Sequence, residues 1–308
     1  MRILFMGTPE FAVEQLRRLV EKGHEICGVF TQPDKPRNRG MKMTFSPVKE
    51  YALTRDLAVY QPVKMRDGSA QALVQELQPE LIVVAAYGRI LPEDILNTPK
   101  YGAINVHSSI LPKYRGAAPI NWAILNGERE TGVTIMHMAE TCDTGDMILR
   151  KKMPVPPEMN AEELFLELAK LGSDAISEAI EQIKNGTASR TPQDHENATY
   201  APMLSRDLSP IDWSRTSTQI LDQIRGLIPW PCAAMQLGDK TVKVYRAETG
   251  GTTNETAGRM KVVKRGIEVA CGNGESVVIT ELQPDGGKRM ATSAYLNGRR
   301  IAAGTYLN

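Results

Sequence analysis

The sequence lacks the features that mark membrane and secreted proteins. No apolar run in its 308 residues comes close to the roughly 18 consecutive apolar residues of a transmembrane helix, so we expect no such helix and no membrane partner. The opening MRILFMGTPEF is interrupted by Gly and Pro too early to form the apolar stretch of a secretory signal. These absences predict a cytoplasmic protein.

Cysteine and histidine are scarce, with four of each. The cysteines form no CxxC pair, which indicates free thiols in a reducing compartment rather than disulfides or a zinc site. The histidines show no metal-ligand spacing either, so we predict that the protein holds no metal. The four cysteines are Cys27, Cys142, Cys232 and Cys271.

Phosphate-binding glycine motifs are also missing. MGTPEF, at residues 6–11, places a Gly-containing turn between a predicted strand and a predicted helix, but neither G-x-G-x-x-G nor GxxxxGK[ST] occurs there. This excludes a dinucleotide site or P-loop of the usual kind.

The net charge of +1 divides into −3 over residues 1–207 and +4 over residues 208–308. A mildly basic C-terminal part is compatible with a polyanionic partner, although surface variation alone produces such imbalances.

Strand-like and helix-like segments alternate along the first half of the chain. This rhythm predicts an α/β fold whose first domain is a Rossmann-like, mostly parallel sheet with helices on both faces. Ligands of such sheets bind outside the carboxyl ends of the strands. The predicted strands are residues 2–7, 25–32, 80–88, 101–108 and 131–140, and the predicted helices are residues 9–23, 46–56, 69–79 and 160–186.

The second part of the chain has a different pattern. TASRTPQDHENATYAPMLSRDLSP follows the long helix and is polar and rich in turn residues, as expected of a linker. Several short alternating segments separated by Gly-rich turns come next, which predicts a small β-barrel or sandwich. The predicted organisation is a catalytic domain at residues 1–187, a linker at 188–207 and a β-domain at 208–308.

YGAINVHS, at residues 101–108, carries two polar side chains on a predicted core strand. Asn105 and His107 are two residues apart, so both point to one face near the carboxyl end of the strand. Histidine accepts protons near neutral pH, and an Asn amide can donate to a developing oxyanion. The alternative is a structural pair whose members satisfy each other.

The turn ETCDTGDMI, at residues 140–148, follows a strand and holds two acids. Asp143 or Asp146 could reach the same crevice, where a carboxylate fixes the tautomer of an imidazole and raises its basicity. The alternative is an ordinary turn, in which Asp and Gly are common.

A second segment, residues 32–47, is a long loop with four basic residues and one acid. It suits phosphate contact, unless it is merely a solvated mobile loop.

INVHSSILPKYRGAAPINWAILNGERETGVTIMHMAETCDTGDMI resembles the signature region of the 10-formyltetrahydrofolate-dependent formyltransferases and hydrolases. FMGTPEFAV, VFTQPDKPRNRG, SPVK, IDWS and PWP resemble the branch of that family that formylates methionyl-tRNA. The resemblance covers essentially the whole chain. Its one small departure is Ile110, where the family usually has Leu.

The resemblance implies a catalytic trio of Asn105, His107 and Asp143, with Asp143 rather than Asp146 as the acid. It further implies 10-formyltetrahydrofolate as cosubstrate, initiator methionyl-tRNA as partner, an OB-like β-barrel that holds the tRNA, and no metal; we expect a monomer. The implied folate-binding residues are Ser109, Ile110, Leu111 and Pro112, and the implied tRNA-binding residues are Arg37, Arg39 and Lys42.

In the reaction so implied, the α-amine of methionyl-tRNA attacks the formyl carbon, and Asn105 with a protonated His107 stabilises the resulting oxyanion. Three alternatives stay open: formyl transfer to a small amine, hydrolysis of 10-formyltetrahydrofolate, and a non-catalytic RNA-binding protein. The intact trio speaks against the last of these, because a binding module does not need it.

Overall fold

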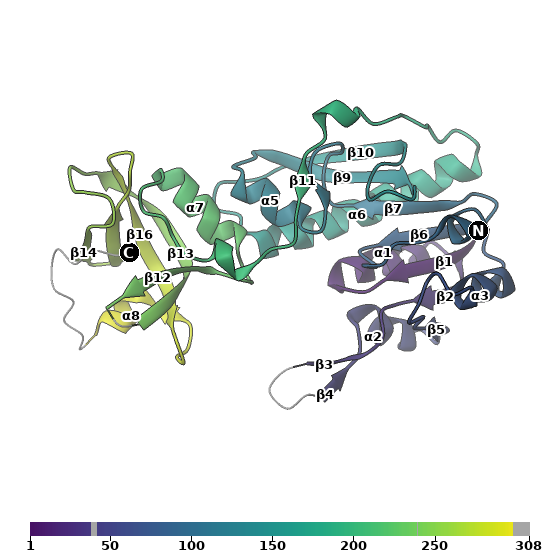
Figure 1. The fold of residues 1–308 in the computed structure, drawn as a ribbon, viewed down its shortest axis with the longest axis horizontal. Coiled ribbons are helices and arrows are strands. Elements are labelled where there is room, and N and C mark those ends of the chain that lie inside the picture. The colour runs from purple at the N-terminus through teal and green to yellow at the C-terminus, as the bar shows by residue number, and fades with distance from the viewer. Residues whose placement is uncertain (38–41, 239, 298–308) are drawn as a thin grey trace. The chain divides into compact units, whose positions relative to one another are not determined.

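The computed structural model describes residues 1–37, 42–238 and 240–297, which belong to two compact units (Figure 1). Unit 1 comprises Met1–Pro119, Glu130–Met153 and Phe165–Ala201, and unit 2 comprises Ile120–Arg129, Pro154–Leu164 and Pro202–Asn308. Two short pieces from the first half of the chain therefore group with the C-terminal part. The predicted division at residues 187 and 208 stays a prediction about separate domains. No helix within the described ranges is long and apolar enough to cross a membrane.

A seven-stranded sheet forms the centre of unit 1, in the order β10-β9-β7-β6-β1-β2-β5. Its five strands from β7 to β5 are parallel, whereas β9 runs antiparallel to β7. This confirms the predicted Rossmann-like, mostly parallel sheet. The strands are β1 (Arg2–Gly7), β2 (Glu25–Phe30), β5 (Val59–Tyr60), β6 (Leu81–Ala85), β7 (Ala103–His107), β9 (Glu130–His137) and β10 (Met147–Pro154).

The helices of this half form where the sequence provides an apolar face and a cap. In α1 the apolar side chains at helical spacing, Phe11, Leu16 and Leu19 among them, are buried. Ser46 caps α2 by accepting the backbone N–H of Lys49, as predicted from SPVK. The helices are α1 (Glu10–Glu21), α2 (Pro47–Leu53), α3 (Ser69–Leu77), α4 (Glu93–Leu96) and α6 (Ala161–Lys184).

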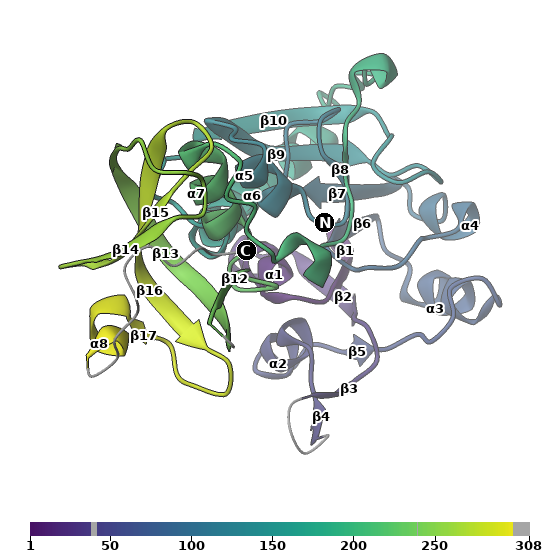
Figure 2. The ribbon, with the colours of Figure 1, turned by 60° about the vertical axis from the view of Figure 1, so that its left-hand side comes forward.

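Residues 32–47, expected to form a long loop, contain a short hairpin. Strands β3 (Lys35–Arg37) and β4 (Lys42–Thr44) pair antiparallel, and the hairpin extends beyond α2 in both views of the ribbon (Figures 1 and 2). Strand pairs of three residues leave little hydrophobic pattern in a basic, Pro-containing sequence, which explains why the pairing escaped prediction.

The segment expected to be a linker is paired with unit 1 as far as Ala201. Strand β11 (Tyr200–Ala201) runs parallel to β8 (Arg115–Gly116), and Thr191 bridges to Met147. Two 3-10 turns, η1 (His195–Asn197) and η2 (Arg206–Leu208), complete the segment. Residues 188–201 are therefore a structural part of unit 1.

Unit 2 contains an antiparallel sheet in the order β12-β13-β16-β15-β14, with β17 paired to β16. The alternating apolar residues of these strands pack with Ile220 and Ile224 of α7 into one core. This confirms the predicted small β-domain as an antiparallel sheet. The elements are α5 (Pro119–Leu125), α7 (Ser217–Gly226), β12 (Ala233–Leu237), β13 (Lys240–Thr252), β14 (Met260–Val263), β15 (Gly266–Ala270), β16 (Glu275–Pro284), β17 (Met290–Ala291) and α8 (Thr292–Leu296).

Candidate active site

The carboxyl ends of β1, β6 and β7 meet at one edge of the parallel sheet, the edge where ligands of such sheets bind. Strand β7 ends there at His107. Along β7, Ile104 and Val106 are buried on one side, while Asn105 and His107 share the other side. The cross-strand partners of these two residues on β9 are Met136 and Thr134.

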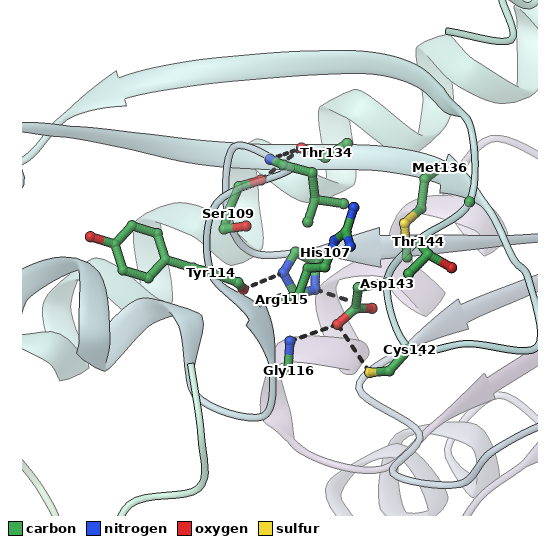
Figure 3. Close-up of polar contacts among 12 residues, drawn as sticks. His107, Ser109, Tyr114, Arg115, Gly116, Thr134, Met136, Cys142, Asp143 and Thr144 are labelled. Carbon is green, nitrogen blue, oxygen red and sulfur yellow. Dashed lines mark hydrogen bonds and ion pairs between the residues drawn. The ribbon is translucent and has the colours of Figure 1, made fainter. Parts of the chain in front are cut away.

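His107 is held between two oxygen acceptors (Figure 3). Its Nε2 lies 2.9 Å from the backbone oxygen of Tyr114, and its Nδ1 lies 3.6 Å from Oδ1 of Asp143. A carbonyl can only accept, so Nε2 donates its hydrogen to Tyr114. The carbonyl of Tyr114 thus fixes the tautomer that was expected to depend on the aspartate. A doubly protonated ring would face an acceptor on each side.

Asp143 is the acid that faces His107. Its Oδ2 accepts the backbone N–H of Gly116 at 2.8 Å and the thiol of Cys142 at 3.3 Å, and its side chain is only 10% exposed. Asp146 instead pairs with Arg190 at 3.9 Å and is far more exposed. The geometry therefore places one of the two predicted acids beside the imidazole, while its catalytic role stays a prediction.

Cys142 keeps its hydrogen beside this carboxylate. Partial desolvation and then the charge of Asp143 raise the pKa of this thiol, which is still accessible to solvent, to about 11. The sulfur is therefore a neutral donor to Asp143 at physiological pH rather than a nucleophile.

Asn105 is half-buried, and its side-chain amide has no hydrogen-bond partner among the residues that the structure describes. The alternative of a mutually satisfied structural pair with His107 therefore finds no support in the contacts. A polar amide left free at the ligand edge of a sheet can donate to a bound group.

The predicted folate loop is held by its own polar contacts. Ser109 donates to the backbone oxygen of Lys113 at 2.6 Å, and the N–H of Leu111 donates to Thr134 Oγ1 at 3.1 Å. The side chains of Ser109 and Leu111 are buried, whereas those of Ile110 and Pro112 are partly exposed. Of the four predicted residues, Ile110 and Pro112 can offer side-chain surface to a ligand.

A polar network at the ends of β1, β2 and β6 was missed in the sequence. Thr8 Oγ1 and Gln32 Nε2 both donate to the backbone oxygen of Tyr87, at 3.1 and 3.0 Å. The loop they hold follows β6 and includes Ala86 and Gly88, both with positive φ. The sequence did offer a signal for this loop: AYG, at residues 86–88, directly follows an all-apolar strand, and a turn at the ligand edge of the sheet is expected there.

The three basic residues predicted to contact tRNA fall in the hairpin segment. Arg37 and Lys42 are paired positions of β3 and β4, while Arg39 lies outside the described residues.

The base of the hairpin is fixed by an ion pair of 2.5 Å between Lys49 and Asp34. Gln61 accepts from Lys49 at 2.9 Å and donates to Asp34 at 2.9 Å, so it joins both members. The Lys49 ammonium also lies 4.0 Å from the centre of the Phe45 ring. These contacts join Asp34, which precedes β3, to Phe45 and Lys49, which follow β4.

Within the described part of the chain, no group of three His, Cys, Asp or Glu residues is arranged to hold a metal ion.

Known proteins resemble this chain over its full length. Residues 1–180 match the family described as Formyl transferase, and residues 203–300 match Formyl transferase, C-terminal domain. Methionyl-tRNA formyltransferase of Caldanaerobacter subterraneus subsp. tengcongensis is 48% identical, with 100% of both chains covered. Its counterpart in Geobacter sulfurreducens is 45% identical, covering 100% of this chain and 96% of that one.

Solved structures share the fold at lower identity. An N-formyltransferase from Helicobacter canadensis, in complex with folinic acid and dTDP-3-aminofucose, superposes with a TM-score of 0.70 at 20% identity, covering 90% of this chain and 98% of that one. HypX from Aquifex aeolicus in complex with tetrahydrofolic acid gives 0.64 at 18% identity, with 99% and 51% covered. The chain belongs to the formyl transferase family and, within it, to the methionyl-tRNA formyltransferases.

Proposed function

We propose that this protein transfers the formyl group of 10-formyltetrahydrofolate to the α-amino group of initiator methionyl-tRNA in the cytoplasm. The product is the N-formylmethionyl-tRNA with which translation begins. Relatives named methionyl-tRNA formyltransferase at 45–48% identity over the whole chain support the acceptor. Structural relatives that bind folinic acid and tetrahydrofolic acid support a folate donor.

The observation that carries the proposal is the free amide of Asn105 beside the His107–Asp143 pair at the carboxyl edge of the sheet. The α-amine attacks the formyl carbon, and the carbonyl oxygen takes up the negative charge of the tetrahedral intermediate. Asn105 donates to that oxygen, and His107 lies on the same strand face, where its charge supports the oxyanion once it has taken up the proton of the attacking amine. An ordinary α-amino group has a pKa near ~8, so a useful fraction is nucleophilic at neutral pH.

Collapse of the intermediate breaks the bond between the formyl carbon and N10. The attacking nitrogen gives up a proton and N10 receives one, so the step needs a group that can accept and return a proton. His107 is suited to this at Nδ1, because Nε2 keeps its hydrogen on the carbonyl of Tyr114 while Nδ1 can take up the proton beside Asp143 and return it. Asp143 stabilises the imidazolium while the proton resides there.

The hairpin and unit 2 supply the tRNA side of the proposal. The basic residues Arg37, Arg39 and Lys42 suit contact with the phosphates of an acceptor stem, and residues 208–308 carry a net charge of +4. A small amine or water as the acceptor does not call for this positive charge, which supports formyl transfer to tRNA over those alternatives.

One assay tests the acceptor. The purified chain is incubated with 10-formyltetrahydrofolate and, in parallel, initiator methionyl-tRNA, elongator methionyl-tRNA, a small amino sugar, or no acceptor. Labelled formyl should appear on initiator methionyl-tRNA and not on the sugar, with little release as formate. Transfer to the sugar, or equal formate release without acceptor, would replace the proposal by one of its alternatives. Light scattering of the same preparation tests the expected monomer.

A further inference from the structure

Residues 188–201, here called the strap, lie against the loop that follows β7. The N–H of Arg115 donates to the backbone oxygen of Thr199 at 2.8 Å, and the N–H of Tyr114 donates to Thr199 Oγ1 at 2.9 Å. Tyr114 provides the acceptor for His107, and Gly116 provides the donor for Asp143. The strap therefore supports the backbone that holds both side chains.

One side chain of the strap reaches the turn that carries Asp143. Gln193 is 5% exposed, and its Nε2 donates to the backbone oxygens of Asp143 and Gly145, at 2.9 Å each. Its Oε1 accepts from Arg115 Nε at 3.1 Å and from Nη2 at 2.6 Å. Gln193 thus joins a buried guanidinium to the turn.

The arrangement leaves only one orientation of this amide. A guanidinium can only donate and a backbone carbonyl can only accept. Arg115, itself 3% exposed, therefore keeps Oε1 on its own side and leaves the NH₂ group for the carbonyls of the turn. Both ends of the amide are hydrogen-bonded within the protein.

The turn needs such support because its backbone is under strain. Asp143 has φ of +56°, a left-handed conformation that costs a non-Gly residue on the order of 1 kcal/mol or more. Gly145 packs so closely that a Cβ there would lie 1.8 Å from the backbone oxygen of His137. Two hydrogen bonds from one buried donor hold the carbonyls on either side of Thr144.

We propose that Gln193 is a positioning residue for Asp143: its Nε2 holds the backbone of the turn so that the carboxylate stays beside His107. The inference rests on the proposed catalytic role of Asp143 and adds a residue 50 positions away in the chain. Gln193 makes no hydrogen bond to His107 or Asn105; besides Arg115 and the turn, its Nε2 lies 3.9 Å from Sδ of Met136, so its link to Asp143 runs through the backbone of the turn.

Replacing Gln193 by Glu separates this role from simple packing. The new carboxylate would keep the size of the side chain and pair with Arg115, but it would place an oxygen against two carbonyl oxygens. We expect Gln193→Glu and Gln193→Ala each to lower kcat on the order of 10-fold to 10²-fold, with KM for both substrates within about twofold of wild type. If the side chain only accepts hydrogen bonds from Arg115 and packs on it, Gln193→Glu keeps wild-type kcat, which would overturn the proposal.

Unit 2 offers a matched control. Gln223 Nε2 also donates to two backbone oxygens, those of Leu208 at 2.8 Å and Pro210 at 2.9 Å, and Gln223 is likewise buried. Gln223→Glu should lower the unfolding temperature at least as much as Gln193→Glu does, because Gln223 Oε1 is buried without a hydrogen-bond partner among the described residues, while kcat at saturating tRNA stays unchanged. An equal loss of kcat in both variants would show a general effect on folding and overturn the specific role of Gln193.

A double-mutant cycle with Asp143→Ala completes the test. If Gln193 acts through Asp143, adding Gln193→Glu to Asp143→Ala should lower kcat no further. If the double variant instead loses kcat by the product of the two single losses, Gln193 does not act through Asp143; this result would overturn the inference but not the proposed catalytic trio. If Asp143→Ala alone keeps full turnover, the catalytic role of Asp143 fails, and the inference fails with it.

Discussion

Asn105→Ala should abolish most of the turnover at almost no cost in stability. The amide is half-buried and makes no hydrogen bond to any described residue, so its removal breaks no hydrogen bond in the described part of the protein. We expect the free energy of unfolding to change by less than about 0.5 kcal/mol. Loss of one donor to an oxyanion costs about 2.7–4 kcal/mol in the transition state, so kcat should fall roughly 10² to 10³-fold.

His107→Ala should differ in a way that the structure explains. The ring is buried and donates to the carbonyl of Tyr114, so truncation removes a buried hydrogen bond and the packing of the ring. This costs about 1–3 kcal/mol of stability, in addition to a loss of turnover of roughly 10²-fold or more. Neighbours on one strand face should thus give similar kinetics and different unfolding curves.

The assay is steady-state formylation at saturating substrates, combined with urea unfolding of the same preparations. Asn160→Ala is a suitable control, because Asn160 Oδ1 accepts from the backbone N–H groups of Glu162 and Glu163 at the start of α6. It should lose about 1 kcal/mol of stability and no turnover. If Asn105→Ala keeps turnover within about threefold of wild type, or unfolds as easily as His107→Ala, the reasoning about a free catalytic amide is refuted.

The remaining predictions concern the acid, the hairpin and its base. Asp143→Ala should lower kcat roughly 10²-fold and Asp146→Ala much less, since only the first carboxylate faces His107; the reverse ranking in the formylation assay would show that the wrong acid was chosen. Replacing Arg37, Arg39 and Lys42 by Ala should weaken tRNA binding. The slope of the logarithm of the tRNA-binding constant against the logarithm of the salt concentration should fall by about one per lost phosphate contact, while folate affinity, titrated separately, stays unchanged. The hydrogen bond from Lys49 lowers the pKa of Asp34. The stability that this pair adds is therefore present above the usual carboxyl pKa of about 4 and is lost as pH falls through the lower pKa of the folded state. In urea unfolding, the free energy of unfolding of Asp34→Asn should decline less steeply with falling pH than that of wild type.

Much of the fold could be predicted from the sequence because its signals are local. Alternating strand and helix periodicity indicated the parallel sheet, and SPVK indicated the start of α2. The spacing of two between Asn105 and His107 placed both on one face of a strand, which needs no knowledge of the partner strands. These inferences depend on neighbours within a few residues.

The site was less predictable where it depends on backbone groups. The partner of His107 Nε2 is a carbonyl of Tyr114, the partner of Asp143 is the N–H of Gly116, and the partners of Gln193 are two carbonyls. Every residue has a carbonyl and nearly every residue an N–H, so no residue type indicates such contacts in advance. A polar, turn-rich segment such as 188–201 consequently has the composition of a linker even where it holds an active site.

Strand β8 explains why those backbone contacts depend on one another. Its residue Gly116 has φ of +111°, and a Cβ there would lie 2.9 Å from the backbone oxygen of Ala201 in the strap. Only glycine fits this close approach without strain. The same approach brings the N–H of Gly116 to the carboxylate of Asp143, while Tyr114, two residues earlier, presents its carbonyl to His107. The strap therefore supports β8, and β8 supplies backbone partners to both the acid and the imidazole, so the geometry on which the proposed proton transfer depends is supported by a segment to which no catalytic role is assigned.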